Sequence, residues 1–346
     1  MKIVNANAIL VNDNQITMYQ KIEKCGRTCY KSEDKITDGS AVKFVGNMLR
    51  SGHTAMLEHG HIYMKLPSKI GNDFIKILND IRTFRTVGDN ATKFFDITVL
   101  PKFSYVSGSF RAFINLFALP FLPHNVITDT VYAAVSEQYP ELFPSKEAAV
   151  MENTHIEIFK TTDDFVNSVL ETDWGLSDVL HEDVKTVKNS IIKKHAVRTI
   201  IFTCDRGVSH EFVRHRPCGF AQESTRYCNY SKDKFGKEIT VIEPCFWPDH
   251  NSPAYHLWKD GCEQAEKSYF ALLDAGATPQ EARSVLPNSL KTELVITATE
   301  EEWQHIVNLR YIGTTGAPHP QMVECMMRAV PLLRTVSLDR IKTVKD

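Results

Sequence analysis

Hydrophobic residues along the chain follow two kinds of spacing, and each predicts one kind of element. Alternating or β-branched runs predict strands, because successive side chains of a strand point to opposite faces. Spacings of three and four predict helices, because those residues share one helix face. The predicted strands cover residues 1–10, 61–66, 97–100, 196–204 and 238–243. The predicted helices cover residues 40–49, 111–118, 253–275 and 320–333, with a shorter one before a turn at 25–29 and another entered from the loop 51–59.

Capping signals mark the helices of the C-terminal third. Thr278, Pro279 and Glu281 have the spacing of a capping box with proline at the first helical position. Thr299 and Glu302 repeat the signal before another helix. Because the predicted strands concentrate before these helices, we expect an α+β fold rather than a βαβ repeat. Such a fold would have a central mixed or antiparallel sheet and a helical C-terminal part.

The segment 67–194 has the weakest pattern of the chain. It holds one predicted strand, one predicted helix, proline-rich loops near 120–124 and 140–144, and an acidic stretch from Glu171 to Lys185. The sequence shows no internal repeat and no low-complexity tract. We therefore expect a single domain over residues 1–346, with this segment as an insertion or elaboration.

The composition is that of a soluble globular protein, with 43% hydrophobic and 24% charged residues. The formal net charge of −2 provides no overall field that attracts nucleic acid, so an anion site must be local. Scattered cysteines without a signal peptide or a transmembrane run predict reduced thiols in a cytoplasm. Cys25 and Cys29 lack a second pair at zinc-binding spacing, so we expect no metal site.

Residues 214–227 carry the strongest chemical signal. Arg214, Arg216 and Arg226 surround Ser224 in the sequence. Arginine forks bind phosphate or carboxylate bidentately and a serine hydroxyl adds a donor, so the segment predicts an anion site. If the preceding helix reaches Arg216, the side chains of Arg214 to Arg216 point about 100° apart and cannot all bind one anion. They would then serve different ligands, or the site would be shared between chains.

Arg214-His215-Arg216, followed after seven residues by Ser224, resembles the RHR-x7-S signature of the flavin-dependent thymidylate synthases (ThyX). Weaker matches follow in the order of that family, and they are Arg27 to Tyr30, His53 to His59, Val285 to Pro287, and Asn308 to Arg310. The resemblance covers roughly residues 1–64 and 196–335. The segment 67–194 has no counterpart in the shorter members of the family.

The resemblance implies a ThyX-like fold and a homotetramer with FAD bound at subunit interfaces. It implies reductive methylation of dUMP to dTMP, with methylenetetrahydrofolate as the carbon donor and NADPH as the reductant of the flavin. In this family no enzyme cysteine attacks the pyrimidine, and FAD is not held by a glycine-rich dinucleotide fingerprint. We expect neither nucleic acid nor a membrane as a partner.

The resemblance also implies roles for individual residues. Those with a catalytic role are His53, Arg214, Ser224 and Arg226. Those that bind the cofactor are Glu58, Arg214, His215, Arg216, Asn308 and Arg310. Those that bind the nucleotide are Glu211, Arg214, Gln222, Glu223, Ser224, Thr225, Arg226 and Lys291.

Two places depart from the pattern of the family. Glu293 stands where some members carry an arginine, and Lys291 could supply the charge instead. The arginine thought to activate the uracil ring would align at residues 323–324, where this chain has valine and glutamate. The nearest candidates for its role are Arg328, about one helical turn later, and His319.

These departures leave two other functions open. A carboxylate accepts a hydrogen bond from an exocyclic amine, so a relative with an altered pyrimidine substrate or a hydroxymethylated product is one alternative. A non-catalytic flavin or nucleic-acid binder on the same scaffold is the other.

Several of these residues also have ordinary structural explanations. The arginine cluster could be a solvated basic face. His53, His59 and His61 could bind a metal, but a flavin-pocket or structural role suits them better. Cys218 has no base beside it and is expected to be an inert thiol. Residues 107–111 could contact substrate, but a strand, a turn and a capped helix explain them equally.

Overall fold

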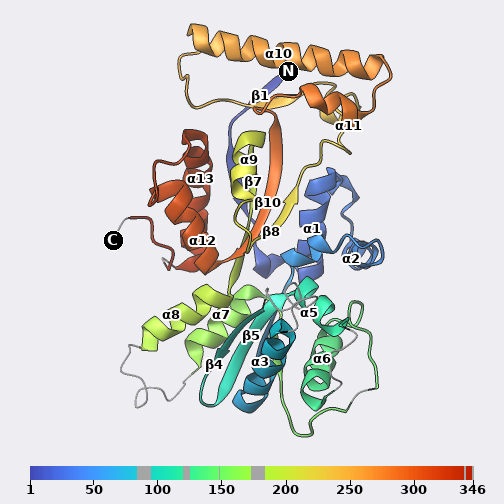
Figure 1. Ribbon diagram of the computed structural model, residues 1–346, viewed down its shortest axis with the longest axis vertical. Helices are drawn as coiled ribbons and strands as arrows, with labels where there is room; N and C mark the ends of the chain where they lie inside the picture. The colour runs from blue at the N-terminus through green and yellow to red at the C-terminus, as the bar shows by residue number, and fades with distance from the viewer. Residues whose placement is uncertain (84–94, 120–124, 148, 173–183, 339, 345–346) are drawn as a thin grey trace.

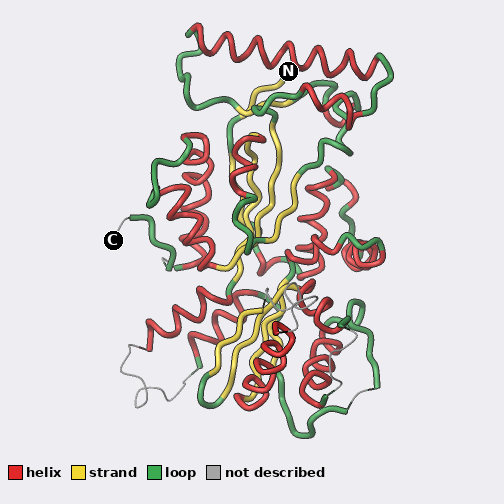
Figure 2. Tube along the Cα trace, viewed as in Figure 1, coloured by secondary structure: helices red, strands yellow, loops and turns green. Residues whose placement is uncertain are grey.

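The computed structural model describes residues 1–83, 95–119, 125–147, 149–172, 184–338 and 340–344. The molecule is elongated, and its layers follow one another along the long axis (Figure 1). A four-stranded sheet lies in the middle, a second four-stranded sheet at one end, and a two-stranded sheet under a long helix at the other (Figure 2). Among the described residues, no helix combines the length and apolar content needed to cross a bilayer.

The middle sheet is antiparallel throughout and has the strand order β2-β7-β10-β8. Its strands are β2 (Asn7–Leu10), β7 (Val197–Asp205), β10 (Lys291–Thr299) and β8 (Gly219–Gln222). The two central strands pair along their whole length, from Val197 opposite Thr299 to Asp205 opposite Lys291. Most of their residues are buried, because elements pack on both faces of the sheet.

Helices from both ends of the chain pack on the middle sheet. They are α1 (Met18–Tyr30), α9 (Arg206–Phe212), α12 (Glu300–Val307) and α13 (Pro320–Ser337), and α2 (Ser40–Arg50) packs against α1. On one face, Phe202 of β7 packs against the rings of Phe212 and Trp303. This cluster fixes the start of α12 and the end of α9, which are the elements that position the motif.

The second sheet is also antiparallel and has the order β4-β5-β3-β6. Its strands are β4 (Phe95–Val99), β5 (Phe103–Ser109), β3 (His61–Pro67) and β6 (Glu157–Phe159). Its helices are α3 (Ser68–Thr83), α5 (Phe110–Phe117), α6 (Val126–Gln138), α7 (Thr162–Glu171) and α8 (Val184–His195). The largest core cluster joins this sheet to Ile22, Phe44 and Val295, so the two large sheets share one core.

At the far end, β1 (Lys2–Val4) pairs in parallel with β9 (Thr240–Ile242). The long helix α10 (Pro253–Asp274) lies across this pair, and α11 (Pro279–Ala282) follows it (Figure 1). Short helices connect the larger elements, and they are η1 (Asp13–Gln15), η2 (Glu33–Lys35), η3 (Thr54–His59), η4 (Asp233–Phe235), η5 (Arg283–Val285) and the π-helix η6 (Asn308–Ile312).

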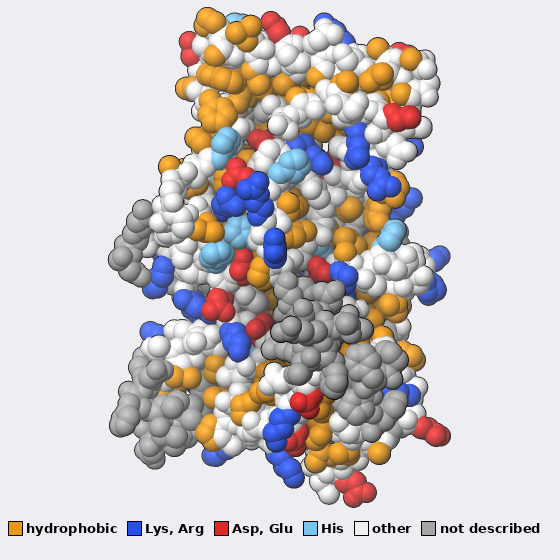
Figure 3. Space-filling model, viewed as in Figure 1, with side chains coloured by type: hydrophobic (Ala, Val, Ile, Leu, Met, Phe, Trp, Pro, Cys, Tyr) orange, Lys and Arg blue, Asp and Glu red, His pale blue; other side chains and the backbone are white. Residues whose placement is uncertain are grey.

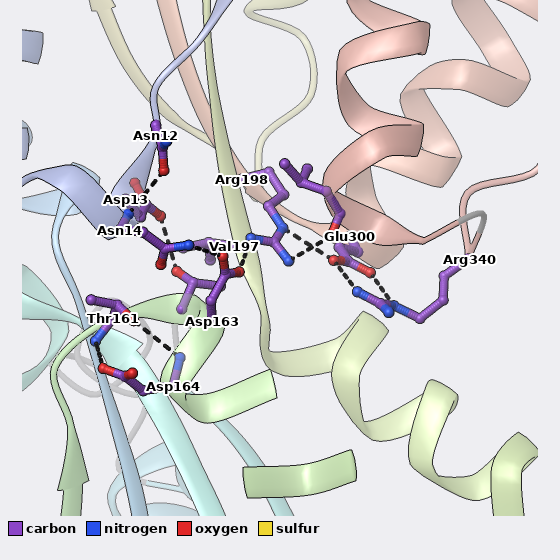
Figure 4. Close-up of polar contacts among 12 residues, drawn as sticks. Asn12, Asp13, Asn14, Thr161, Asp163, Asp164, Val197, Arg198, Glu300 and Arg340 are labelled. Carbon is purple, nitrogen blue, oxygen red and sulfur yellow. Dashed lines mark hydrogen bonds and ion pairs between the residues drawn. The ribbon is translucent and has the colours of Figure 1, made fainter. Parts of the chain in front are cut away.

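A buried ion network joins the two large sheets (Figure 4). Arg198 at the start of β7 donates to Glu300 at 3.1 Å and to Asp163 of α7 at 2.7 Å. Arg340 donates to the other oxygen of Glu300 at 2.7 Å. Asp163 also accepts a hydrogen bond from Asn14. The network therefore links five distant segments at the junction of the sheets.

The predicted α+β fold is confirmed, and several elements differ from the sequence prediction. Residues 1–10 form two strands in different sheets rather than one strand. The predicted turn at 25–29 lies inside α1, because a capping box at Thr17 starts a helix that continues to Tyr30. The helical C-terminal third also contains β10, the central strand of the middle sheet.

Candidate active site

The motif does not lie on one helix. The side chain of Asp205 caps α9 by accepting from the amide of Val208 at 2.7 Å, and the helix ends at Phe212. Arg214-His215-Arg216 therefore lies in the turn that follows, so the helix does not reach Arg216. The four residues of β8 then carry the chain about 13 Å before residues 223–227. The two ends of the motif thus form two separate clusters.

The first cluster surrounds His215, which is buried. Arg310 Nε lies 3.2 Å from His215 Nε2, and Glu302 Oε1 lies 3.1 Å from Nδ1. An arginine can only donate, so Nε2 is the acceptor and Nδ1 carries the proton that is donated to Glu302. Arg310 also forms an ion pair with Glu211 at 2.8 Å. The structure thereby brings together Glu211, His215 and Arg310 within one chain.

Arg214 and Arg216 flank His215 and are exposed. Within the described part of the chain, neither guanidinium group makes a hydrogen bond or an ion pair. Figure 3 shows basic, acidic and histidine side chains gathered on the middle part of the visible face. Two exposed arginines beside an anchored histidine leave ten N–H donors without a protein acceptor, and this donor set suits an anionic ligand.

The second cluster forms after β8. The amide of Ser224 donates to the carbonyl of Cys29 at 3.1 Å, and Ser224 Oγ accepts from the amide of Arg226 at 3.3 Å. Thr225 Oγ1 accepts from Arg283 at 3.2 Å. The side chain of Arg226 is exposed. A hydroxyl group and a guanidinium group of this turn therefore lie beside the guanidinium group of Arg283, which comes from a distant segment.

The loop with His53 reaches the second cluster through two tyrosines. The ring of Tyr227 meets the ring of Tyr30 edge-on at 5.6 Å, and the hydroxyl of Tyr30 lies 3.2 Å from His53 Nδ1. His53 is exposed at the start of η3. Tyr30 and Tyr227 thus link His53 to the serine end of the motif.

Four charges compensate one another beside this turn. Lys291 Nζ lies 2.9 Å from both Glu223 Oε2 and Glu293 Oε1, and Lys31 pairs with the other oxygen of Glu293. Burial disfavours the ionised form of Glu293, yet Lys291 and Lys31 hold its pKa below the usual value. Lys291 therefore neutralises two carboxylates and does not provide a free positive charge in place of the missing arginine. Gln222, also predicted to bind nucleotide, instead donates to Ser209 at 2.8 Å.

Glu58 connects η3 to the motif and to the second sheet. A Cβ atom on Gly219 would lie 3.1 Å from Glu58 Cβ and 3.3 Å from its carbonyl oxygen, so glycine allows this close approach. Arg111 of α5 forms an ion pair with Glu58. Burial raises the pKa of Glu58, and Arg111 opposes that rise. The contact with Arg111 was not predicted, because no sequence pattern connects residues so far apart.

A pocket of about 280 Å³ opens beside Glu58 and Gly219, where the two large sheets meet. Its lining includes Pro217 from the motif and Glu302 and His305 from α12. Asn308 lies apart from it: its side chain accepts from Gln304, and it lines a different pocket with Lys193 and Thr314. The structure therefore does not bring Asn308 to His215, although η6 supplies Arg310.

Three possible metal ligands approach one another in this region. Ligand atoms of His215, Glu302 and His305 lie within 4.8 Å of one another. Both ring nitrogens of His215 are already hydrogen-bonded, so we assign the group to the hydrogen-bonded cluster. His59 is buried and His61 is half-buried at the wall of the pocket, and desolvation lowers the pKa of each to about 3.

Two further expectations concern side chains near the motif. Cys218 is buried, and burial raises the pKa of its thiol, as expected for an inert cysteine. The candidates for the uracil-activating role lie at the start of α13, with His319 before its first turn and Arg328 exposed. Burial raises the pKa of Glu324, and Arg328 opposes the rise. The contacts of the described residues assign the role to none of these.

The chain belongs to the family described as "Thymidylate synthase complementing protein" (Thy1), whose model matches residues 130–331. The match begins inside the segment for which we expected no counterpart. The chain is 31% identical over 120 residues to the flavin-dependent thymidylate synthase of Thermococcus onnurineus (strain NA1), which covers 34% of this chain and 48% of that protein. With the enzyme of the same description from Geobacter sulfurreducens it shares 24% identity over 165 residues, or 47% of this chain and 63% of that protein.

The chain thus spans only about half to two thirds of the length of these relatives. A crystal structure of the UMP/dUMP methylase PolB from Streptomyces cacaoi bound with 5-Br dUMP is also similar. It shares 19% identity with a TM-score of 0.37, and the match covers 51% of this chain and 87% of that one.

Proposed function

We propose that this protein is a flavin-dependent thymidylate synthase. The reaction would convert dUMP, methylenetetrahydrofolate, NADPH and a proton into dTMP, tetrahydrofolate and NADP⁺, with FAD as the bound cofactor. When bound, the flavin would carry hydride from NADPH toward the pyrimidine. The observation that carries the proposal is the convergence of the motif turn with Glu58 and Arg310, which come from three separate parts of the chain.

The residues present suit a flavin. Gly219 keeps the floor of the pocket free of a side chain where Glu58 approaches, and carboxylate and imidazole groups line its walls. At about 280 Å³ the pocket lies at the lower end of ligand-site volumes, so it has room for part of a dinucleotide. Arg214 and Arg216 would hold the diphosphate outside it.

The second cluster suits the nucleotide. Ser224 and Arg226 would bind the phosphate of dUMP, and Arg283 beside Thr225 would add positive charge. The buried pair of Glu223 and Lys291 fixes the end of β8, so it would position the turn rather than contact the phosphate. The resemblance implies sites shared among the subunits of a homotetramer, and in this chain residues of both large sheets line one pocket.

The test combines binding and turnover. The purified chain should show a flavin absorbance spectrum after loading with FAD and should form dTMP from dUMP with methylenetetrahydrofolate and NADPH. Ser224→Ala and Arg226→Ala should each weaken dUMP binding about tenfold while FAD stays bound. Ser231→Ala, on an exposed turn nearby, is the matched control. A protein that cannot be loaded with FAD, or that loads but forms no product from dUMP, contradicts the proposal.

One observation favours a second candidate. Beside the turn of Ser224, the carboxylate of Glu293 pairs with Lys31 and Lys291. The sequence has no arginine at residues 323–324. A carboxylate could accept from the amine of a cytosine ring. Incubation with dCMP in parallel with dUMP, followed by the mass of the product, separates the two candidates: a gain of a methyl group on dCMP alone, or of a hydroxymethyl group, supports the second.

A further inference from the structure

The two large sheets are built in the same order. β3, α3, β4, β5 and α5 follow one another around the second sheet, and β7, α9, β8, β10 and α12 around the middle sheet. In both, the first and last strands form the central antiparallel pair, and the intermediate strand pairs with the last. The middle sheet differs in the segment with β9, α10 and α11, which is inserted before its last strand.

The strand registers coincide. In the second sheet, His61 begins β3 and stands opposite Ser109, which ends β5. In the middle sheet, Val197 begins β7 and stands opposite Thr299, which ends β10. Two residues before the end of β5, Ser107 stands opposite Asp96 of β4. Two residues before the end of β10, Thr297 stands opposite Gly219 of β8. Ser109 and Thr299 both cap the next helix, accepting from the amide three residues on.

Hydrogen bonds at the junction are reciprocal. His59, just before β3, bonds to Thr297 at 2.8 Å, and His195, just before β7, bonds to Ser107 at 2.9 Å. Each half therefore offers the other the same histidine contact in return, as two subunits do across a twofold axis. Within each half the backbone contacts match as well: the amide of Phe110 donates to Gly60 at 3.0 Å, and that of Glu300 donates to Ala196 at 2.9 Å.

The preceding segments match as well. β2 leads into α1 and β6 leads into α7, and each helix begins with a capping box, at Thr17 and at Thr161. Buried positions of the two helices have the same spacing, and they are Met18, Lys21, Ile22 and Cys25 against Thr162, Phe165, Val166 and Val169. These strands are exchanged: β2 pairs with β7, while β6 pairs with β3.

The pocket of about 280 Å³ lies where the halves meet and is lined by matching positions from both. These matching pairs are Glu58 with Lys194, His61 with Val197, Asp96 with Gly219, and Ser109 with Thr299. Only the second half carries the Arg-His-Arg motif; the stretch between α3 and β4 lacks it in sequence and lies outside the described residues. The family match over 130–331 likewise covers the second half.

We infer that residues 7–138 and 157–337 are two copies of one unit, and that the copy without the motif acts as a built-in partner subunit completing a single flavin site, with Arg111 as a positioning residue for Glu58. The inference rests on the proposed function. The second copy carries the opposite charges at the matching positions. Lys194 stands there at the position of Glu58, and Glu301 at the position of Arg111. Lys194 donates instead to the carbonyl of Ile97 at 2.8 Å, so the ion pair of Glu58 with Arg111 distinguishes the first copy.

The first measurement is stoichiometry. FAD titrated into the full-length apoprotein and followed by quenching of flavin fluorescence should bind once per chain. Two FAD per chain would overturn the loss of a site in the first copy. A wild-type chain that binds no FAD would overturn the inference together with the proposed function. The next measurement can overturn the inference while the proposed function stands.

The second measurement addresses Arg111. Arg111→Met should weaken FAD binding about tenfold, and Arg111→Lys should recover most of it, because a positive charge beside Glu58 is restored. Since burial raises the pKa of Glu58 and Arg111 opposes the rise, FAD binding by Arg111→Met should be lost at a higher pH on acidification. Lys76→Met, which breaks an exposed ion pair on α3, is the control.

Each result bears on one claim. Wild-type affinity and an unchanged pH profile in Arg111→Met would overturn the role of the first copy while leaving the proposed function standing. If Arg111→Met does not fold, Arg111→Gln decides: a loss of about tenfold that Arg111→Lys recovers supports the inference, and wild-type affinity with an unchanged pH profile overturns it.

Discussion

The unit on β7 and β10 and the unit on β3 and β5 place buried side chains at matching positions, but one uses charges where the other uses apolar groups. Arg198 and Glu300 form a buried ion pair in the first of these units. Ile62 and Phe110 occupy the matching positions in the other and are fully buried. The backbone contacts of both units are nevertheless the same, so strand register rather than side-chain chemistry maintains the shared framework.

This comparison is tested most strongly at Glu300. Glu300→Ala leaves Arg198 and Arg340 buried without their common partner, and we expect a loss of about 3–5 kcal/mol in the free energy of unfolding. Chemical denaturation at neutral pH measures it. Glu301→Gln, one residue further on and exposed, should cost less than about 1 kcal/mol. Equal losses in the two variants would show that the network contributes nothing particular.

The reciprocal histidine contacts provide a finer test. Burial lowers the pKa of both His59 and His195 to about 3, so both rings are neutral and need hydrogen-bond partners. Ser107→Ala leaves His195 its second partner, Thr98, at 2.9 Å. Thr297→Ala removes the one side-chain partner of His59 among the described residues. We expect losses of about 1 and about 2 kcal/mol, measured by denaturation, and the reverse order would contradict the contacts.

The smallest expected effect is a pH dependence at Asp163. Burial opposes its ionisation, but Arg198 holds its pKa below the unfolded value. A depressed pKa contributes stability above the unfolded pKa, about 4, and this contribution is lost as the pH falls through the folded pKa. Asp163→Asn should therefore flatten the loss of stability between about pH 4 and pH 2, by less than about 1 kcal/mol for a side chain that is 35% exposed. An unchanged slope would show that the pair is not stabilising.

Elements with a clear amphipathic stripe and caps could be predicted from the sequence. α2 was found from its apolar spacing, and α10 because its apolar spacing agrees with Pro253 at its start and Gly276 after its end. β10 was missed because Leu294, Val295 and Ile296 form a short apolar run, buried on both faces, that has no alternation. The end of the helix before the motif stayed open in the sequence, because nothing local signals that it ends at Phe212.

The candidate site was predictable where a short motif carries it and not where distant segments meet. The Arg-His-Arg and Ser224 ends were named from the sequence, and the family match supports the recognition. The pairing of Lys291 with two carboxylates and of Arg111 with Glu58 depends on the packing of separate elements. The repeat was not detected in the sequence, because matched positions such as Phe110 and Glu300 make the same backbone hydrogen bond but carry different types of side chain.

The exchange of β2 and β6 also constrains how the chain folds as it is made. β2 is synthesised near the beginning, but its partner β7 follows only after the whole first copy and part of the second. The emerging first copy must therefore keep one strand of its own unpaired while its sheet waits for β6. Pairings between such distant residues form slowly, and unpaired edges attract other chains. Ribosome-bound fragments that end before β7 are thus where aggregation and chaperone binding should concentrate.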